Sequence, residues 1–99
     1  MSLPAATTAD DEFPVTACFC LHAHADPGAM SRVLELFAKR GLIPSAWHSA
    51  TCGTDHARLT IDIEMHGLAR DVMEYIAACM RQMPFVEVVL TSERRSITG

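Results

Sequence analysis

The sequence has no long apolar run and few basic residues, and each shortage excludes a class of protein. No stretch approaches the roughly 18 apolar residues that span a membrane, and the N-terminus lacks a charged start followed by an apolar block. Eight Lys and Arg residues against twelve Asp and Glu give a formal charge of -4, whereas nucleic-acid binding usually shows as clustered basic residues. We therefore expect a cytoplasmic protein that binds neither a membrane nor a nucleic acid.

The sequence also lacks the short motifs that mark common enzyme classes. It contains no Gly-x-Ser-x-Gly turn, no phosphate-binding glycine loop and no His-Glu-x-x-His pair. Four cysteines occur without a secretory signal or the spacing of a small disulfide scaffold, so we expect reduced thiols. We predict that the protein is not an enzyme, with no catalytic residue and no cofactor.

What is present is enough for one folded domain. With 99 residues, of which 49% are hydrophobic, the chain can bury one core but not two. A domain of this size is marginally stable alone, which favours association with a partner. Residues 1–13 lack periodicity and are predicted to be a flexible arm, residues 14–91 form the domain, and residues 92–99 are a polar tail.

Four segments have the composition or the alternation of β-strands. They are residues 15–24, 42–52, 56–65 and 85–91. The second segment is predicted to be an edge strand, because Pro44 cannot donate a ladder hydrogen bond. Apolar and polar residues alternate cleanly in the third, which predicts one covered sheet face and one wetter face.

Two further segments have apolar residues at helical spacing. The first begins with Asp26 as a predicted N-cap and Pro27 in the first turn, and it ends at Gly41. The second starts near Leu68 and is closed by Pro84. The resulting order βαββαβ predicts an α+β ferredoxin-like sandwich: an antiparallel sheet of order 4-1-3-2 with two helices on one face.

The start of the first predicted helix is similar to a known family. Gly28 to Val33 reads Gly-Ala-Met-Ser-Arg-Val and Phe37 to Gly41 reads Phe-Ala-Lys-Arg-Gly. These motifs resemble the first half of an ACT domain, and most closely the regulatory small subunit of acetolactate synthase. The resemblance extends over residues 15–91. It implies a regulatory or accessory subunit that forms a homodimer or higher oligomer, often with sheets joined edge to edge, and that modulates a thiamine-diphosphate-dependent catalytic subunit of branched-chain amino-acid biosynthesis.

The same resemblance implies that a small amino acid binds near the Gly28 turn at a subunit interface. The candidate ligand-binding residues are Asp26, Pro27, Gly28, Ala29, Met30 and Ile43. Elementary physics supports such a site, because N–H groups at a helix start attract a carboxylate and a glycine lets the ligand approach the backbone. Asp26 is the candidate partner for the ammonium group. The alternative is that Asp26 only caps the helix and Gly28 only serves the turn.

Two positions depart from the small subunits that sense valine. Those subunits generally carry asparagine where this chain has Ala25 and Ile43. A pocket without these polar groups is insensitive, takes another ligand, or belongs to a purely structural subunit. These alternatives stay open, as does a free-standing ACT-like protein with an unrelated partner.

The first predicted strand offers a different kind of site. Cys18, Cys20, His22 and His24 share one face, and thiolates with imidazoles suit zinc or copper. Alternate strand residues lie about 6.6 Å apart, so the four cannot reach one ion, and we predict no metal site while keeping a metal-binding module as the alternative function. The strand order should also bring both histidines towards Thr60, Asp62 and Glu64, which predicts a modest pH dependence of dimerisation between about pH 5.5 and 7.5.

Overall fold

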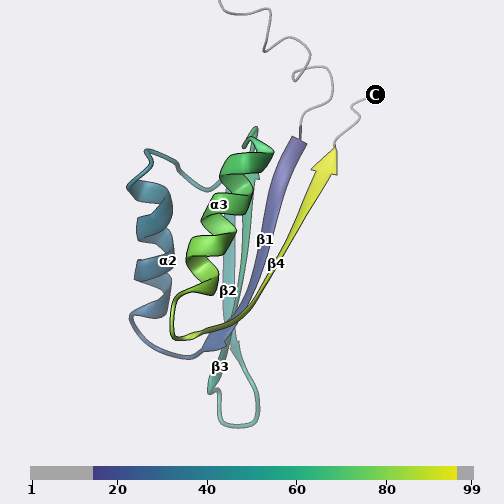
Figure 1. The fold of residues 1–99 in the computed structure, drawn as a ribbon. Coiled ribbons are helices and arrows are strands. Elements are labelled where there is room, and N and C mark those ends of the chain that lie inside the picture. The colour runs from purple at the N-terminus through teal and green to yellow at the C-terminus, as the bar shows by residue number, and fades with distance from the viewer. Residues whose placement is uncertain (1–14, 96–99) are drawn as a thin grey trace, which may run out of the picture.

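The computed structural model of the chain describes residues 15–95, which form four strands and two helices (Figure 1). In chain order these elements are β1 (Val15–His24), α2 (Ala29–Ala38), β2 (Ala46–Cys52), β3 (Arg58–His66), α3 (Arg70–Arg81) and β4 (Val86–Arg95). The predicted arm at residues 1–13 and the last four residues of the predicted tail lie outside the described residues. Within residues 15–95, no helix is both long enough and apolar enough to cross a membrane.

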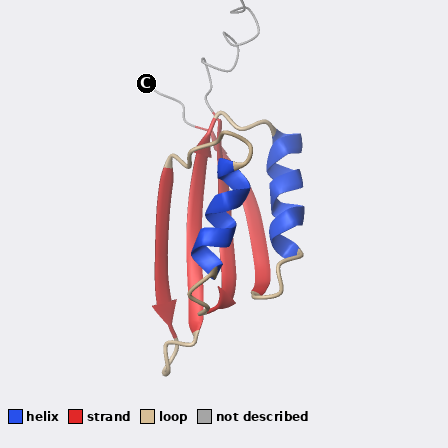
Figure 2. Cartoon of the chain, turned by 90° about the vertical axis from the view of Figure 1, so that its left-hand side faces the viewer, coloured by secondary structure: helices blue, strands red, loops and turns tan. Residues whose placement is uncertain are grey.

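The strands form one antiparallel sheet of order β2-β3-β1-β4. This confirms the predicted order, read from the opposite edge. Both helices lie on the same side of the sheet, and no helix of the described residues covers the other side (Figure 2). We call that uncovered side the open face. The chain is therefore a two-layer α+β sandwich, as the alternating polar and apolar residues of β3 predict.

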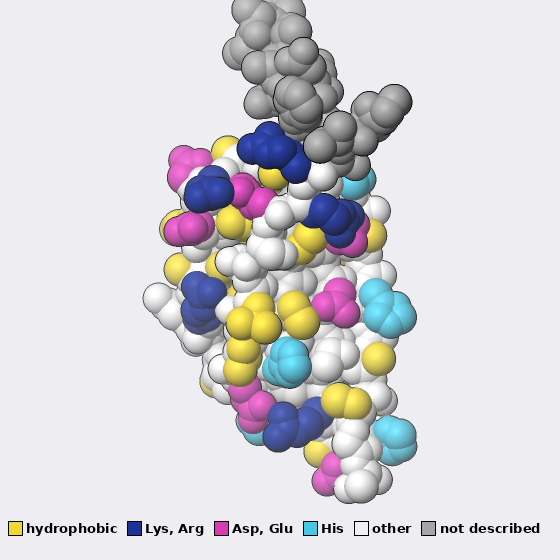
Figure 3. All heavy atoms as spheres, turned by 90° about the vertical axis from the view of Figure 1, so that its right-hand side faces the viewer, with side chains coloured by type: hydrophobic (Ala, Val, Ile, Leu, Met, Phe, Trp, Pro, Cys, Tyr) yellow, Lys and Arg dark blue, Asp and Glu magenta, His cyan; other side chains and the backbone are white. Residues whose placement is uncertain are grey.

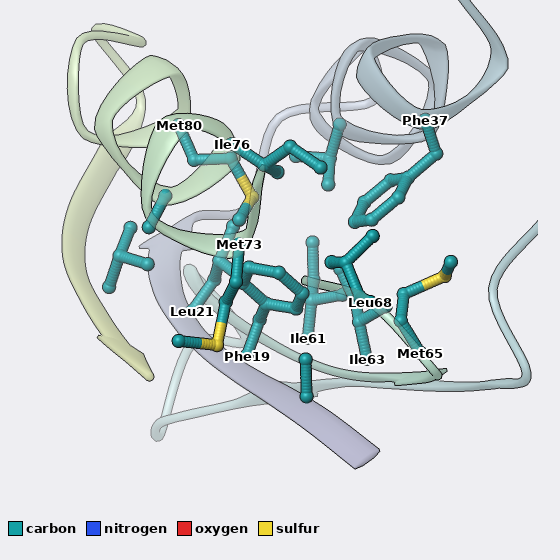
Figure 4. Packing of buried hydrophobic residues seen from close by; sticks show 14 of the residues in the cluster. Phe19, Leu21, Phe37, Ile61, Ile63, Met65, Leu68, Met73, Ile76 and Met80 are labelled. Atoms are coloured by element: carbon teal, nitrogen blue, oxygen red, sulfur yellow. The ribbon is translucent and has the colours of Figure 1, made fainter. Parts of the chain in front are cut away.

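The core fills the space between the sheet and the two helices (Figure 4). Phe19 of β1 and Phe37 of α2 meet in it edge to face, with their ring centroids 5.8 Å apart. The other large, fully buried side chains are Leu21, Val33, Ile61, Ile63, Ile76 and Met80. They come from β1, β3 and both helices, so burial of this one cluster joins the layers.

The first helix begins later than predicted. Gly28, not Asp26, is the N-cap of α2, and the carboxylate of Asp26 makes no cap. Instead, Asp26 Oδ1 accepts a hydrogen bond from the Gly28 N–H at 2.7 Å, and its carbonyl accepts from the Ala29 N–H at 2.9 Å. Asp-Pro-Gly thus forms a turn of its own before the helix, which explains the difference.

The predicted stop at Gly41 is confirmed. This glycine has φ of 69°, and the N–H of Leu42 bonds back to the carbonyl of Phe37 at 2.9 Å. A left-handed residue followed by such a bond is a common way to end a helix. β2 begins only at Ala46, after Pro44, and it lies at the sheet edge as predicted.

The last strand is longer than predicted. Ser92 to Arg95 continue β4 instead of forming a tail, because the long partner β1 offers a ladder out to Val15, which pairs with Arg95. Their polar side chains are accommodated by ion pairs at the edge, including one from Glu93 to Arg70 at 2.6 Å. The β1–β4 ladder is regular except between His22 and Ala23, where the register shifts by one residue at a bulge.

Candidate functional site

The turn between β1 and α2 is fixed to two other parts of the chain. The His24 N–H donates to the carbonyl of Phe85 at 2.9 Å, and the Ala25 N–H donates to the carbonyl of Ala57 at 2.8 Å. The turn therefore lies against the loop before β4 and against the start of β3. The start of α2, the turn at Asp26 and the loop residue Phe85 therefore lie close together.

A hollow of about 380 Å³ opens beside this turn. We call it the turn hollow, and its lining residues are His24, Asp26, Gly28, Arg32, Pro84 and Phe85. Its volume lies within the range of small-molecule sites. It combines one carboxylate, one guanidinium and the apolar surface of a proline and a phenylalanine. Such a set of groups matches a small zwitterion with an apolar part.

The start of α2 borders this hollow at Gly28. The first helical hydrogen bond runs from the Arg32 N–H to the Gly28 carbonyl at 3.1 Å. The N–H groups of Met30 and Ser31 precede that bond in the first turn, where helical N–H groups have no helical acceptor. Gly28 has φ of -85°, which any residue can adopt, so the turn itself does not require a glycine there.

The structure divides the predicted ligand-binding residues among different places. Asp26 and Gly28 line the turn hollow, and Pro27 is exposed in the turn between them. The side chain of Ala29 is fully buried in the core, and that of Ile43 is 85% exposed. Because successive helical residues point about 100° apart, the side chains of Ala29 and Met30 cannot face the same hollow.

Met30 lies on a second, apolar hollow of about 420 Å³. Its lining residues are Met30, Ser31, Leu34, Pro44 and Trp47. The Ser49 hydroxyl donates to the Met30 sulfur at 3.2 Å and joins α2 to β2 there. This hollow offers apolar contact but no charged group.

Sequence reasoning missed Arg32, Pro84 and Phe85 as lining residues of the turn hollow. Arg32 belongs to the Gly-Ala-Met-Ser-Arg-Val motif and lies one turn after Gly28, so its helical spacing was a usable signal. Pro84 and Phe85 reach the turn only because α3 returns the chain to β1. No local pattern in the sequence announces that contact.

The metal-binding alternative gains no support from the geometry. Within the described residues there is no group of three or more His, Cys, Asp or Glu side chains placed to hold a metal ion. The four cysteines are free. Cys18, Cys20, His22 and His24 alternate along β1 on the open face, as predicted.

The cross-strand partners of these residues differ in part from the prediction. His22 pairs with Thr60 as expected, but His24 pairs with Arg58. Asp62 and Glu64 lie opposite Cys20 and Cys18 instead of opposite the histidines. The register fixes these pairs, and it could not be read from a strand order alone.

The open face has three groups whose pKa is shifted. Hydrogen bonds and charge from Arg94 hold the pKa of the Glu64 carboxyl below its ordinary value and raise the pKa of the Arg94 guanidinium. Burial raises the pKa of the Cys20 thiol, and a hydrogen bond to Asp62 raises it further. The thiol of Cys20 is therefore held in its protonated, less reactive form.

The fold defines the class of the protein, and sequence comparison gives its family. A four-stranded antiparallel sheet of order β2-β3-β1-β4 with two helices on one face is the ferredoxin-like α+β arrangement. A sequence model described as the ACT-like domain matches residues 10–96. The chain therefore belongs to the ACT-like domain family. No curated protein matches the chain in sequence.

Several solved structures share this fold. The ACT domain from GTP pyrophosphokinase of Chlorobium tepidum aligns with a TM-score of 0.62 and 11% identity, over 80% of this chain and 86% of that domain. The C-terminal domain of the MgtC protein from Mycobacterium tuberculosis gives 0.63 and 14%, over 81% and 87%. The regulatory subunit of aspartate kinase from Thermus flavus gives 0.57 and 15%, over 81% of this chain and 54% of that chain. At such low identity, the similarity shows the fold alone.

Proposed function

We propose that the chain is a regulatory or accessory subunit that binds a small amino acid in the turn hollow and thereby modulates a catalytic partner. The observation that carries the proposal is that an acidic residue, Asp26, and a basic residue, Arg32, line the same hollow of ligand size. Membership of the ACT-like domain family supports a regulatory role. The chemistry would then belong to the partner, and this chain would supply the ligand-dependent signal.

A free α-amino acid fits the groups that line the hollow. Its carboxylate can bind the guanidinium of Arg32, which presents paired donors. Its ammonium group can bind Asp26. One oxygen of Asp26 already accepts from Gly28 at 2.7 Å, but a carboxylate has about four acceptor positions, so the turn and the ligand can share it.

The rest of the hollow selects the ligand side chain. Pro84 and Phe85 provide apolar surface in the hollow. Ala25 and Ile43, which stand where valine-sensing small subunits carry asparagine, do not line it. The ligand side chain would therefore be small or apolar and held by contact instead of by an amide. We expect a selectivity that differs from the valine response of those subunits.

The partner is the finer part of the proposal. The motifs at Gly28 to Val33 and at Phe37 to Gly41 favour the thiamine-diphosphate-dependent catalytic subunit of acetolactate synthase. The resemblance also implies a homodimer or higher oligomer with sheets joined edge to edge, and β2 and β4 are the edge strands available. A free-standing ACT-like protein with another partner is the alternative.

Calorimetric titration with the branched-chain and other small amino acids tests the ligand. Asp26→Asn keeps an oxygen for the Gly28 N–H but removes the charge, and Arg32→Gln removes the guanidinium, so each should weaken binding at least tenfold. Lys39→Gln, which changes an exposed cation at the other end of α2, is the matched control and should bind like the unchanged chain. Absence of heat with every amino acid would reject the ligand, although not the accessory role.

Co-purification with an acetolactate synthase catalytic subunit from the same source tests the partner. A stable complex whose activity changes when this chain and an amino acid are added would support the finer proposal. If no complex forms and activity does not change, the acetolactate synthase partner is rejected. The calorimetric result stands independently of that outcome.

A further inference from the structure

The open face of the sheet has an apolar centre, which is unusual for a face that meets water. Leu90 is 57% exposed and Val88 is 42% exposed on β4, and the half-buried Cys20 and His22 are their neighbours on β1. Figure 3 shows apolar side chains in the middle of this side of the molecule, with charged side chains around them. An antiparallel sheet with one solvated face normally carries polar residues there.

Ion pairs occupy both ends of the same face. At one end, Arg94 contacts both carboxylate oxygens of Glu64, at 3.1 and 3.3 Å. At the other end, Glu87 contacts Arg58 at 3.4 Å and His24 at 3.3 Å. An apolar centre with paired charges at both ends is the usual composition of a protein–protein interface. The exposed Asp62 of β3 lies at the side of this centre, next to Cys20.

The charged side chains at the two ends of the open face are arranged so that opposite charges meet when two copies of the face are placed together. β3 carries Glu64 at one end and Arg58 at the other, whereas β4 carries Arg94 at the first end and Glu87 at the second. A twofold axis that crosses the strands reverses these ends. It brings Glu64 of one copy opposite Arg58 of the other, and it places Arg94 at the same end as Glu87 of the other copy, one row of side chains out of line with it. An axis parallel to the strands produces neither pair.

The same axis also matches the apolar centre with itself. The register places Cys20 beside Leu90, and His22 beside Val88, in two adjacent rows across the sheet. The midpoint between Glu64 and Arg58 on β3 lies between these rows. Each Leu90 therefore meets Val88 of the other copy, and each Cys20 meets His22 of the other copy.

We propose that two copies of this chain pack through their open faces, related by a twofold axis that lies between the sheets and crosses the strands. Strands lie about 4.8 Å apart and rise about 3.3 Å per residue, so this four-stranded face covers roughly 500 Å². Two such faces bury roughly 1,000 Å², which is at the lower limit for a specific interface. The pairing is separate from the proposed amino-acid binding, and it takes the place of an edge-to-edge contact as the contact that forms the dimer.

Complementary substitutions test both the face and the register. Leu90→Lys places an ammonium group against Val88, and Val88→Glu places a carboxylate against Leu90, so each variant alone should sediment as a monomer of 10.8 kDa. Mixing the two variants pairs the new charges at one contact and restores Leu90 against Val88 at the other. The mixture should then sediment at twice the chain mass, like the unchanged full chain.

The control is Ile43→Lys, an equally strong change at an 85% exposed residue outside the open face. It should leave the dimer intact, and circular dichroism should show that all three variants fold like the unchanged chain. A monomeric unchanged chain would overturn the proposal, and so would a dimer that survives Leu90→Lys. Failure of the mixture to associate, when each variant alone is monomeric, would overturn the proposed axis.

Discussion

Phe19 on the central strand β1 and Phe37 on helix α2 meet with their ring planes at 81°. Both side chains are almost completely buried, at 1% and 0% exposure. This edge-to-face contact is the point at which α2 is fixed to the middle of the sheet. Since α2 begins at the turn hollow, the contact also positions the proposed ligand site.

Removal of the Phe37 ring should therefore destabilise the whole domain. We expect Phe37→Ala to lower the free energy of unfolding by about 3–5 kcal/mol, because a large buried side chain leaves a cavity. Urea unfolding followed by circular dichroism measures the change. Leu34→Ala, on the exposed side of the same helix, is the control and should cost less than about 1 kcal/mol.

Gly41 should tolerate a side chain less well than Gly28. Gly41 has φ of 69°, so Gly41→Ala should cost about 1 kcal/mol through backbone strain, even though an added Cβ meets nothing within 4 Å. Gly28→Ala should unfold nearly like the unchanged chain, because φ at Gly28 is -85°. Thermal melts of the two variants give the comparison, and equal losses would contradict the strain argument.

The ion pair between Glu64 and Arg94 should make stability depend on pH in the acidic range. The folded-state pKa of Glu64 is held below its ordinary value of 4.5, chiefly by hydrogen bonds to Arg94. The stabilisation is thus complete above the ordinary value and is lost as the pH falls through the lowered one. The Glu64→Gln variant should be slightly less stable than the unchanged chain at pH 7 and equally stable near pH 2 or below. Because Glu64 is exposed, the difference should be small, and a constant gap across the range would contradict the assignment.

Cys20 should react more slowly with iodoacetamide than Cys52. The Cys20 thiol is half-buried and its pKa is raised by burial and by Asp62, whereas Cys52 is exposed at the end of β2. The thiolate is the reacting form, so less of it means slower alkylation. Mass spectrometry of peptides after timed alkylation near pH 8 gives both rates. Faster labelling of Cys20 would contradict the structure of the open face.

The fold could be predicted from the sequence because its local patterns agree with one another. The clean alternation from Leu59 to Met65 predicts a half-covered strand, and the structure buries the apolar members of that pattern. With two helices on one side, right-handed connections leave one strand order. The end of β4 could not be found this way, since Ser92 to Arg95 are polar and pair only because β1 lies beside them.

The candidate site was only half predictable. Asp26 and Gly28 belong to a local turn whose chemistry is visible in the sequence, and both line the hollow. Phe85 reaches the hollow through a backbone contact with His24, which is 61 residues away along the chain. The predicted member Ile43 lies outside because Gly41 and Pro44 turn the chain away from α2 before β2 begins.

The bulge between β1 and β4 decides where one charge lies. His22 pairs with Val88, and a regular ladder would then pair the buried Ala23 with Glu87. That register would point a carboxylate at the helices, in the interior. By passing over Glu87, the ladder pairs Ala23 with Val86 instead, so that a valine enters the core side and the carboxylate meets Arg58 and His24. Because the ladder leaves Glu87 unpaired, its carboxylate stays at the surface, and β4 avoids burying an anion without a partner.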